Sequence, residues 1–329
     1  MVRTEEVRRL APAVLKILAL AAVYFASARV GLLEQVVIDG VVVTPLWPPT
    51  GIALSCLLYL GLATWPGIAL GTLFVILSLG PLSYATLGII AGNTLAPVCA
   101  CLMLRAVDFH LALDRLRDGI ALVTLGAFGG MLISATLGSG VQWLAGSLPS
   151  SGFWPTWAAW WVGDAMGVLV ITPLLLVFRT VRRPRDLRPY RWIEATLLAV
   201  CSAAVAVLAT QSPLAVLFLV FPLIVWAALR FQLAGAAPCV LLVSVLAISA
   251  AKSRSGPFSG QSLLEAMVNL QALNGSAALT ALLLSAIVTE QNSVRRKIEQ
   301  ACKDLAEVVE RLAPGETMRR WPPPEGDER

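Results

Sequence analysis

The sequence has few charged residues and a single histidine. Charged side chains make up 14% of its 329 residues, against roughly 25% in soluble globular proteins. The lone histidine, His110, excludes a site built from several histidines. The sequence also lacks a CxxC pair, a P-loop, a GxSxG elbow, a kinase motif set and a zinc signature. We therefore expect no enzymatic activity, no cofactor and no resident metal.

Long apolar runs dominate the chain instead. Hydrophobic residues make up 57% of it, and the mean hydropathy is +0.78. A membrane-spanning helix needs about 20 apolar residues. The sequence predicts an all-α fold, a polytopic integral membrane helical bundle of about 8–10 transmembrane helices. The predicted segments are residues 10–31, 47–64, 66–80, 82–104, 119–145, 155–178, 192–210, 213–230, 233–251 and 263–289. The third is short, and the second and third could form a hairpin of half-spans, so eight and ten full crossings both stay open.

Positive charges lie in alternate loops. They cluster before the first span, in the 105–118 and 179–191 loops, after the eighth span and after the tenth. Because Lys and Arg favour the cytoplasmic side, ten crossings with both termini cytoplasmic place these clusters together. Only Lys252 and Arg254 fall on the other side. The positive charge is thus explained by topology, and we expect no nucleic-acid partner. An A-x-A pattern at 26–28 resembles a signal-peptide site, but the apolar run is long for one, and we expect it to be retained.

The chain divides into four parts. These are a cytoplasmic N-terminus (1–9), a transmembrane domain (10–290), a cytoplasmic helix (291–312) and a disordered tail (313–329). The helix is predicted from mostly apolar positions spaced alternately four and three residues apart, which is typical of a coiled coil. These positions are Ile287, Gln291, Val294, Ile298, Ala301, Leu305, Val308 and Leu312. An amphipathic helix lying on the membrane or the bundle is the alternative. Prolines and charges after Leu312 indicate disorder.

The stretch WPTWAAWWVGDAMGVLVITP (154–173) places an acid, Asp164, near the middle of a predicted span. A charged group at this depth costs about 2.5–3.5 kcal/mol on insertion scales, so it normally faces a protein interior or a wet cavity. Gly163 and Gly167 flank the acid and would let another segment come close. From chemistry alone, Asp164 is either part of a functional site or a structural acid that holds helices together.

Two other stretches carry candidate residues. Trp47, Pro48 and Pro49 suit the start of a helix, or a rigid lip over the outer mouth of a cavity. Asn93 lies within the fourth span, where an amide usually bonds across helices and less often binds a ligand. A pairing of Asn93 with Asp164 stays open. The candidate site comprises Asp164, Trp160, Trp161, Gly163, Gly167, Asn93, Trp47, Pro48 and Pro49.

Six stretches resemble, in order, the bacterial membrane-associated sensor domain of the first MASE type. They are WPPTGIALS (47–55), WPGIALGTLF (65–74), GNTLAP (92–97), DRLRD (114–118), WWVGDAMGVLVITPLLL (160–176) and FPLIVWAALRF (221–231). The resemblance covers about residues 10–290. It implies an input module of the bacterial inner membrane, followed in its family by a histidine kinase or by cyclic-di-GMP synthesis or breakdown domains. It assigns no ligand.

Three hypotheses follow. The preferred one is a multi-pass sensor without a fused output domain, which signals through the helix that carries Val294, Ile298, Leu305, Val308 and Leu312. Its expected partners are the lipid bilayer, a second copy of the chain, and a separate histidine kinase or cyclic-di-GMP enzyme. The second is a small-solute or ion transporter, which glycine-rich helices and a midplane acid would suit. The third is a membrane scaffold with a structural acid.

Overall fold

The computed structural model describes residues 2–38, 41–180, 189–212, 216–261 and 263–312. Within these ranges each of the ten predicted apolar segments contains a helix. The first helices are α1 (Val2–Gly31), α2 (Pro48–Leu60), α3 (Trp65–Leu79) and α4 (Tyr84–Ala106). A continuous helical stretch follows, made of α5 (Leu116–Ala121), the π-helix η3 (Leu122–Gly129) and α6 (Gly130–Leu144). The last are α7 (Phe153–Thr180), α8 (Pro189–Gln211), α9 (Val220–Phe231), α10 (Leu233–Lys252) and α11 (Leu263–Leu312).

Eight of these helical segments are long and apolar enough to cross a membrane. The shorter ones are α2 and the helix that runs from Leu217 through α9. The third segment was predicted to be short, and α3 has 15 residues. The second segment, α2, is shorter still, with 13 residues. The chain turns at Gly61, whose φ of 93° favours glycine, and Leu62–Thr64 then join the third segment. The predicted all-α, multi-pass bundle is confirmed.

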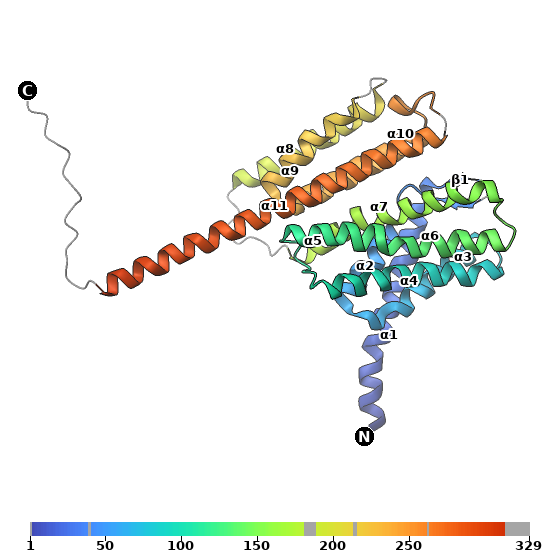
Figure 1. Ribbon diagram of the computed structural model, residues 1–329, viewed down its shortest axis with the longest axis horizontal. Coiled ribbons are helices and arrows are strands. Elements are labelled where there is room, and N and C mark those ends of the chain that lie inside the picture. Colours follow the sequence, from blue (N-terminus) through green and yellow to red (C-terminus); the bar gives the residue numbers. More distant parts are fainter. Residues whose placement is uncertain (1, 39–40, 181–188, 213–215, 262, 313–329) are drawn as a thin grey trace, which may run out of the picture.

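One small sheet was not predicted. Strands β1 (Val36–Ile38) and β2 (Val41–Val43) pair antiparallel, with Val36 opposite Val43. The sequence between the strands is Asp39-Gly40, a pair that is frequent in two-residue hairpin turns. The β-branched residues on either side suit extended backbone. This hairpin lies between α1 and α2 at one end of the bundle (Figure 1).

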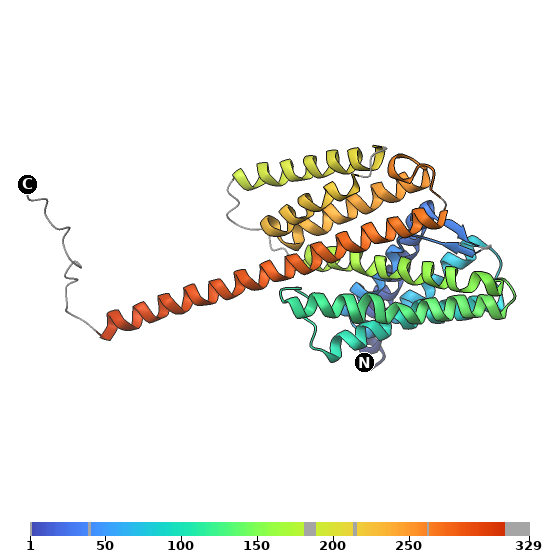
Figure 2. The same cartoon turned by 45° about the horizontal axis from the view of Figure 1, so that its top comes forward.

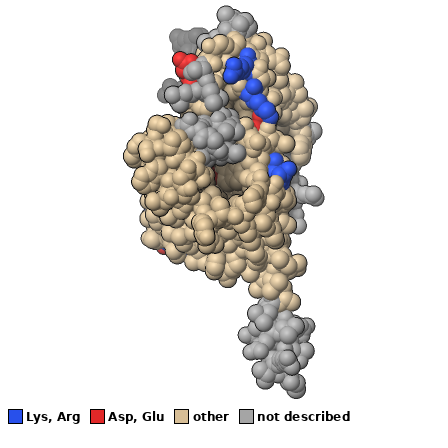
Figure 3. All heavy atoms as spheres, turned by 90° about the vertical axis from the view of Figure 1, so that its right-hand side faces the viewer, with Lys and Arg blue, Asp and Glu red and all other residues tan. Residues whose placement is uncertain are grey.

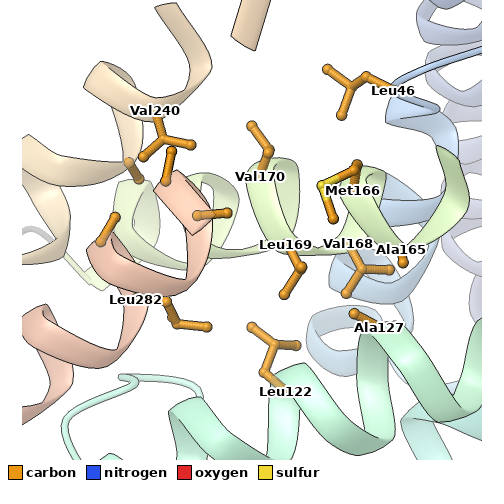
Figure 4. Packing of buried hydrophobic residues seen from close by; sticks show 14 of the residues in the cluster. Leu46, Leu122, Ala127, Ala165, Met166, Val168, Leu169, Val170, Val240 and Leu282 are labelled. Carbon is orange, nitrogen blue, oxygen red and sulfur yellow. The ribbon is translucent and has the colours of Figure 1, made fainter. Parts of the chain in front are cut away.

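Helix α7 lies at the centre of the core. Each residue from Gly163 to Val170 is buried, and α7 contacts α2, α6, α10 and α11. Figure 4 shows Val168 and Leu169 facing Leu122 and Ala127 of the η3 stretch. Protein on all sides of these middle turns explains why residues 163–170 are apolar except at Asp164.

Helix α11 runs along the bundle and then extends well beyond it (Figures 1 and 2). It contains 50 residues without a break. The predicted helix at 291–312 is therefore helical and continuous with the last span. Beyond the bundle, Val294, Ile298, Leu305 and Val308 are 51%, 59%, 64% and 50% exposed. The predicted coiled-coil pairing stays a prediction, and the predicted disorder of 313–329 lies outside the described residues.

Candidate functional site

Asp164 is buried in the middle of α7, with 1% of its surface exposed. The hydroxyl Oγ1 of Thr50 donates a hydrogen bond of 2.8 Å to Oδ1 of Asp164. The Ser134 hydroxyl and the Trp160 indole also approach the carboxyl group. Its second oxygen, Oδ2, is buried without a hydrogen bond to any described residue. The acid is therefore held in place on one side and unsatisfied on the other.

The start of α2 packs directly on α7 beside this acid. The Trp47 amide donates to the Gly163 carbonyl at 3.0 Å. A Cβ atom at Gly163 would lie 2.3 Å from the Thr44 carbonyl oxygen, and one at Gly167 would lie 2.0 Å from the Trp47 carbonyl oxygen. Only glycine allows backbone to approach this closely, so the close approach predicted at these two residues is present.

Helix α2 begins at the level of Asp164 rather than at the end of the bundle. Trp47 precedes its first residue, and Pro48 occupies the first helical position, where a missing N–H costs nothing. Its 13 residues span about 20 Å, short of the roughly 30 Å hydrocarbon core. Non-helical backbone at membrane depth is tolerated where protein buries it or where it lines a cavity. Residues 44–46 are buried, and Thr44 and Trp47 line a cavity. The N-terminal, partly positive end of α2 lies near the Asp164 carboxyl group.

A cavity of about 290 Å³ lies against the acid. The end of the bundle that carries the β1–β2 hairpin is shown in Figure 3, where the surface is hollowed near its centre and is mostly uncharged. Aromatic and polar residues form one part of the cavity wall, and aliphatic residues form the rest. The lining residues are Tyr24, Leu32, Thr44, Trp47, Thr72, Val75, Ile76, Leu79, Ile89, Asn93, Gln142, Trp160, Gly163 and Asp164.

The structure separates the candidate residues into two groups. Trp47, Asn93, Trp160, Gly163 and Asp164 line the cavity. The other four do not line it. Pro49 and Gly167 are buried behind it, Pro48 borders an apolar groove next to α10, and Trp161 points toward the η3 stretch. The Trp161 indole donates to the Phe128 carbonyl at 2.9 Å, so its role is to join α7 to η3.

Asn93 and Asp164 do not bond to each other directly. The Asn93 carbonyl oxygen Oδ1 accepts a hydrogen bond of 2.9 Å from the Ser134 hydroxyl, which itself approaches Asp164. Asn93 therefore joins α4 to α6, which is the cross-helix role expected most often for an intramembrane amide.

Sequence reasoning missed Tyr24, Thr50, Thr72 and Gln142. Tyr24 reaches the cavity from α1, and a Cβ atom at Gly71 would lie 2.8 Å from its side chain. The available signal was weak, since each is an uncharged polar residue within an apolar segment. Thr72 is also buried near the Tyr24 hydroxyl, and its own hydroxyl forms no hydrogen bond of normal length and angle to any described residue. Like Oδ2 of Asp164, it has unused hydrogen-bonding capacity.

Among the described residues there is no cluster of three or more His, Cys, Asp or Glu side chains that could hold a metal ion. No Lys, Arg or His is among the residues that line the cavity. The cavity therefore has one acidic group, and none of its lining residues forms a nucleophile–base pair.

Bundle and pocket together define a multi-pass membrane protein with a ligand-sized cavity beside an intramembrane acid. The model of the MASE1 family matches residues 17–292, which is most of the chain, and the chain belongs to this family. MASE1 is a family of membrane-associated sensor domains, so the chain has a membrane sensory input role. No curated protein and no solved structure matches the chain.

Proposed function

We propose that the protein is a non-enzymatic sensor of the bacterial inner membrane. A cue that binds in the cavity beside Asp164 shifts the packing of α7, and α11 carries this shift to a cytoplasmic partner. The observation that carries the proposal is the contact between α7 and α11. A Cβ atom at Gly275 of α11 would lie 3.7 Å from the Met166 side chain of α7, which is two residues from Asp164. Ala278 of α11 and Leu169 of α7, five residues from Asp164, line one small cavity.

The exposed apolar seam of α11 supports pairing with a second copy of the chain. It consists of Val294, Ile298, Ala301, Leu305 and Val308. Its apolar residues follow the alternating four-three spacing of a two-stranded coil, and the described ones beyond the bundle are half exposed or more. In a parallel pair, Glu290 of one helix and Arg295 of the other occupy flanking positions where opposite charges attract. A change in α11 would then alter the geometry of the pair, which a histidine kinase or a cyclic-di-GMP enzyme would read.

Crosslinking in cells tests this proposal. Photo-crosslinking residues are placed at Val294 and Leu305 in the seam, and at Arg296 and Lys303 on the opposite face as matched controls. We expect self-crosslinks from the seam positions only. We also expect these positions to capture an output enzyme, and the amount captured to change when Asp164 is replaced by Asn. Equal crosslinking from both faces of α11 would contradict pairing through this seam. Crosslinks to the protein's own cytoplasmic loops alone would contradict it as well.

The buried core favours a sensor over a transporter. On the C-terminal side of Asp164, the α7 side chains from Ala165 to Val170 are buried and pack against the η3 stretch and Val240 (Figure 4). A transporter needs a polar route past such a layer. A proton- or solute-flux assay in proteoliposomes should therefore give no flux above that of protein-free vesicles.

A further inference from the structure

The cavity beside Asp164 combines an incompletely satisfied acid with three aromatic side chains. Tyr24, Trp47 and Trp160 line it together with the carboxyl group. Oδ2 of Asp164 lacks a hydrogen bond to any described residue, and the side chain is almost fully buried. The partial positive charge at the start of α2 is roughly half an elementary charge, so it does not neutralise a carboxylate.

We propose that this cavity binds a small organic cation of the amine or quaternary ammonium class. The inference rests on the proposed sensor function and names the chemical class of its ligand. A buried carboxylate without a cationic partner is costly, and a bound cation would supply that partner. Aromatic rings attract a cation over their faces, and such rings around an acid are how proteins recognise quaternary ammonium groups.

Other ligand classes fit this wall less well. An anion would find no basic side chain among the residues that line the cavity, and it would be repelled by Asp164. A divalent metal ion prefers six or more oxygen ligands and usually several carboxylates, whereas Asp164 is the only acid in this lining. An apolar ligand would leave the acid and the Thr72 hydroxyl unsatisfied.

The size of the cavity restricts the ligand further. Its volume of about 290 Å³ lies just below the range for small-molecule pockets, roughly 300–1,000 Å³. A cation the size of choline is small enough for a cavity of this volume. Polar groups on the wall away from the acid, such as Gln142 and Thr44, could accept or donate hydrogen bonds to a hydroxyl on the same molecule. The same ammonium chemistry also occurs on lipid headgroups.

A titration with choline and its neutral isostere tests the charge requirement. The full chain is placed in phosphatidylglycerol nanodiscs, and calorimetry follows binding of choline or of 3,3-dimethylbutan-1-ol, with protein-free discs as the blank. We expect saturable choline binding that is at least about tenfold tighter than binding of the isostere. Equal affinities, or no choline binding, would overturn the proposal.

Variants locate the bound cation. Asp164→Asn should weaken choline binding by at least about tenfold, because it removes the charge with little change in shape. Asp118→Asn is the matched control, since Asp118 is equally buried but lies outside the cavity. Wild-type affinity in Asp164→Asn would place the cation elsewhere and overturn the assignment.

A second pair of variants keeps the test valid if Asp164→Asn does not fold. Trp160→Leu should weaken choline binding by about two- to thirtyfold, with Trp160→Phe in between, while binding of the neutral isostere changes little. Equal losses for choline and the isostere would mean that the ring supplies only apolar surface, against the proposal.

Lipid composition distinguishes the two sources of the cation. If a headgroup occupies the cavity, adding phosphatidylcholine to the discs will lower the apparent affinity for free choline. If the ligand is a free cation, the affinity will stay the same. Failure of choline binding together with intact seam crosslinks at Val294 would overturn the ligand class and leave the sensor function standing.

Discussion

At the scale of single residues, the pairing of Thr50 with Asp164 determines how an acid is accommodated in the core. The hydroxyl of Thr50 lies in the first turn of α2 and donates to Oδ1 at 2.8 Å. A hydrogen bond to a charged group contributes about 1.5–3 kcal/mol net. The start of α2 therefore stabilises the acid both through this bond and through its helix dipole.

We expect Thr50→Val to lower the melting temperature measured in detergent, because it leaves the acid without its short hydrogen bond at a cost of about 1–3 kcal/mol. Thr50→Ser keeps a hydroxyl at this position and should behave almost like the wild type. In the double variant Thr50→Val/Asp164→Leu, both partners are apolar, so the loss should be smaller than the sum of the two single losses. Additive losses would show that the two side chains are not coupled.

A second residue-scale prediction concerns the contact between α2 and α7. Gly167→Ala would place its Cβ 2.0 Å from the Trp47 carbonyl oxygen, a backbone atom that cannot rotate away. We expect a loss of about 1–3 kcal/mol, seen as a lower melting temperature. Gly140→Ala is the control, since a Cβ there has no neighbour within 4 Å. Equal melting temperatures for the two variants would contradict the close approach.

The candidate site was predictable only in part, for a physical reason. The acid in an apolar stretch stands out in the sequence because a charged group is costly in a membrane helix. Gly163 and Gly167 stand out because their spacing is typical of closely packed membrane helices. Tyr24 and Thr50 do not stand out. Whether they face the cavity depends on how α1 packs on α3 and how α2 packs on α7, and hydropathy says little about such rotations. Trp161, next to Trp160 in the sequence, was predicted as a site residue, but its side chain faces the η3 stretch instead of the cavity.

At the scale of elements, the sequence located the apolar segments correctly but did not predict the lengths of all the helices in them. Hydropathy depends on local composition, so all ten segments were predicted as helices. The true length of α2 depends on Pro48 at its start and on the turn at Gly61, after which the chain begins a new segment. The β1–β2 hairpin was overlooked because strands of three residues give little periodic signal.

Helix α11 provides the prediction at this scale. We expect Ala301→Pro to reduce crosslinking at Leu305 and to leave crosslinking at Val294 intact, because proline breaks the helix interior at a cost of about 3 kcal/mol. Ala301→Leu should have the opposite effect at Leu305, since it enlarges an apolar seam position. If both variants crosslink like the wild type, the seam does not pair at this position.

At the scale of the whole molecule, the two ends of the bundle differ in charge and in contacts. At the end from which α11 projects, Arg230 bonds Glu194 at 2.6 Å, and Glu290 of α11 accepts from the Leu116 amide at 2.9 Å. At the other end, Lys252 lies 3.4 Å from Glu34. The cavity lies toward this second end, so a cue arriving there and an output on α11 would be separated by the full bundle.

The distribution of positive charge predicts that the α11 end is cytoplasmic. Native Cys302 is exposed on α11 and serves as the inner reporter. A membrane-impermeant maleimide should label it in inverted vesicles and not in intact spheroplasts. Ser147→Cys in a Cys302→Ser background should show the reverse, since Ser147 is exposed in the turn between α6 and α7 at the opposite end. If Cys302 were labelled in intact spheroplasts, the cavity would face the cytoplasm. The cue would then have to be a cytoplasmic molecule, and α11 could not reach a cytoplasmic partner.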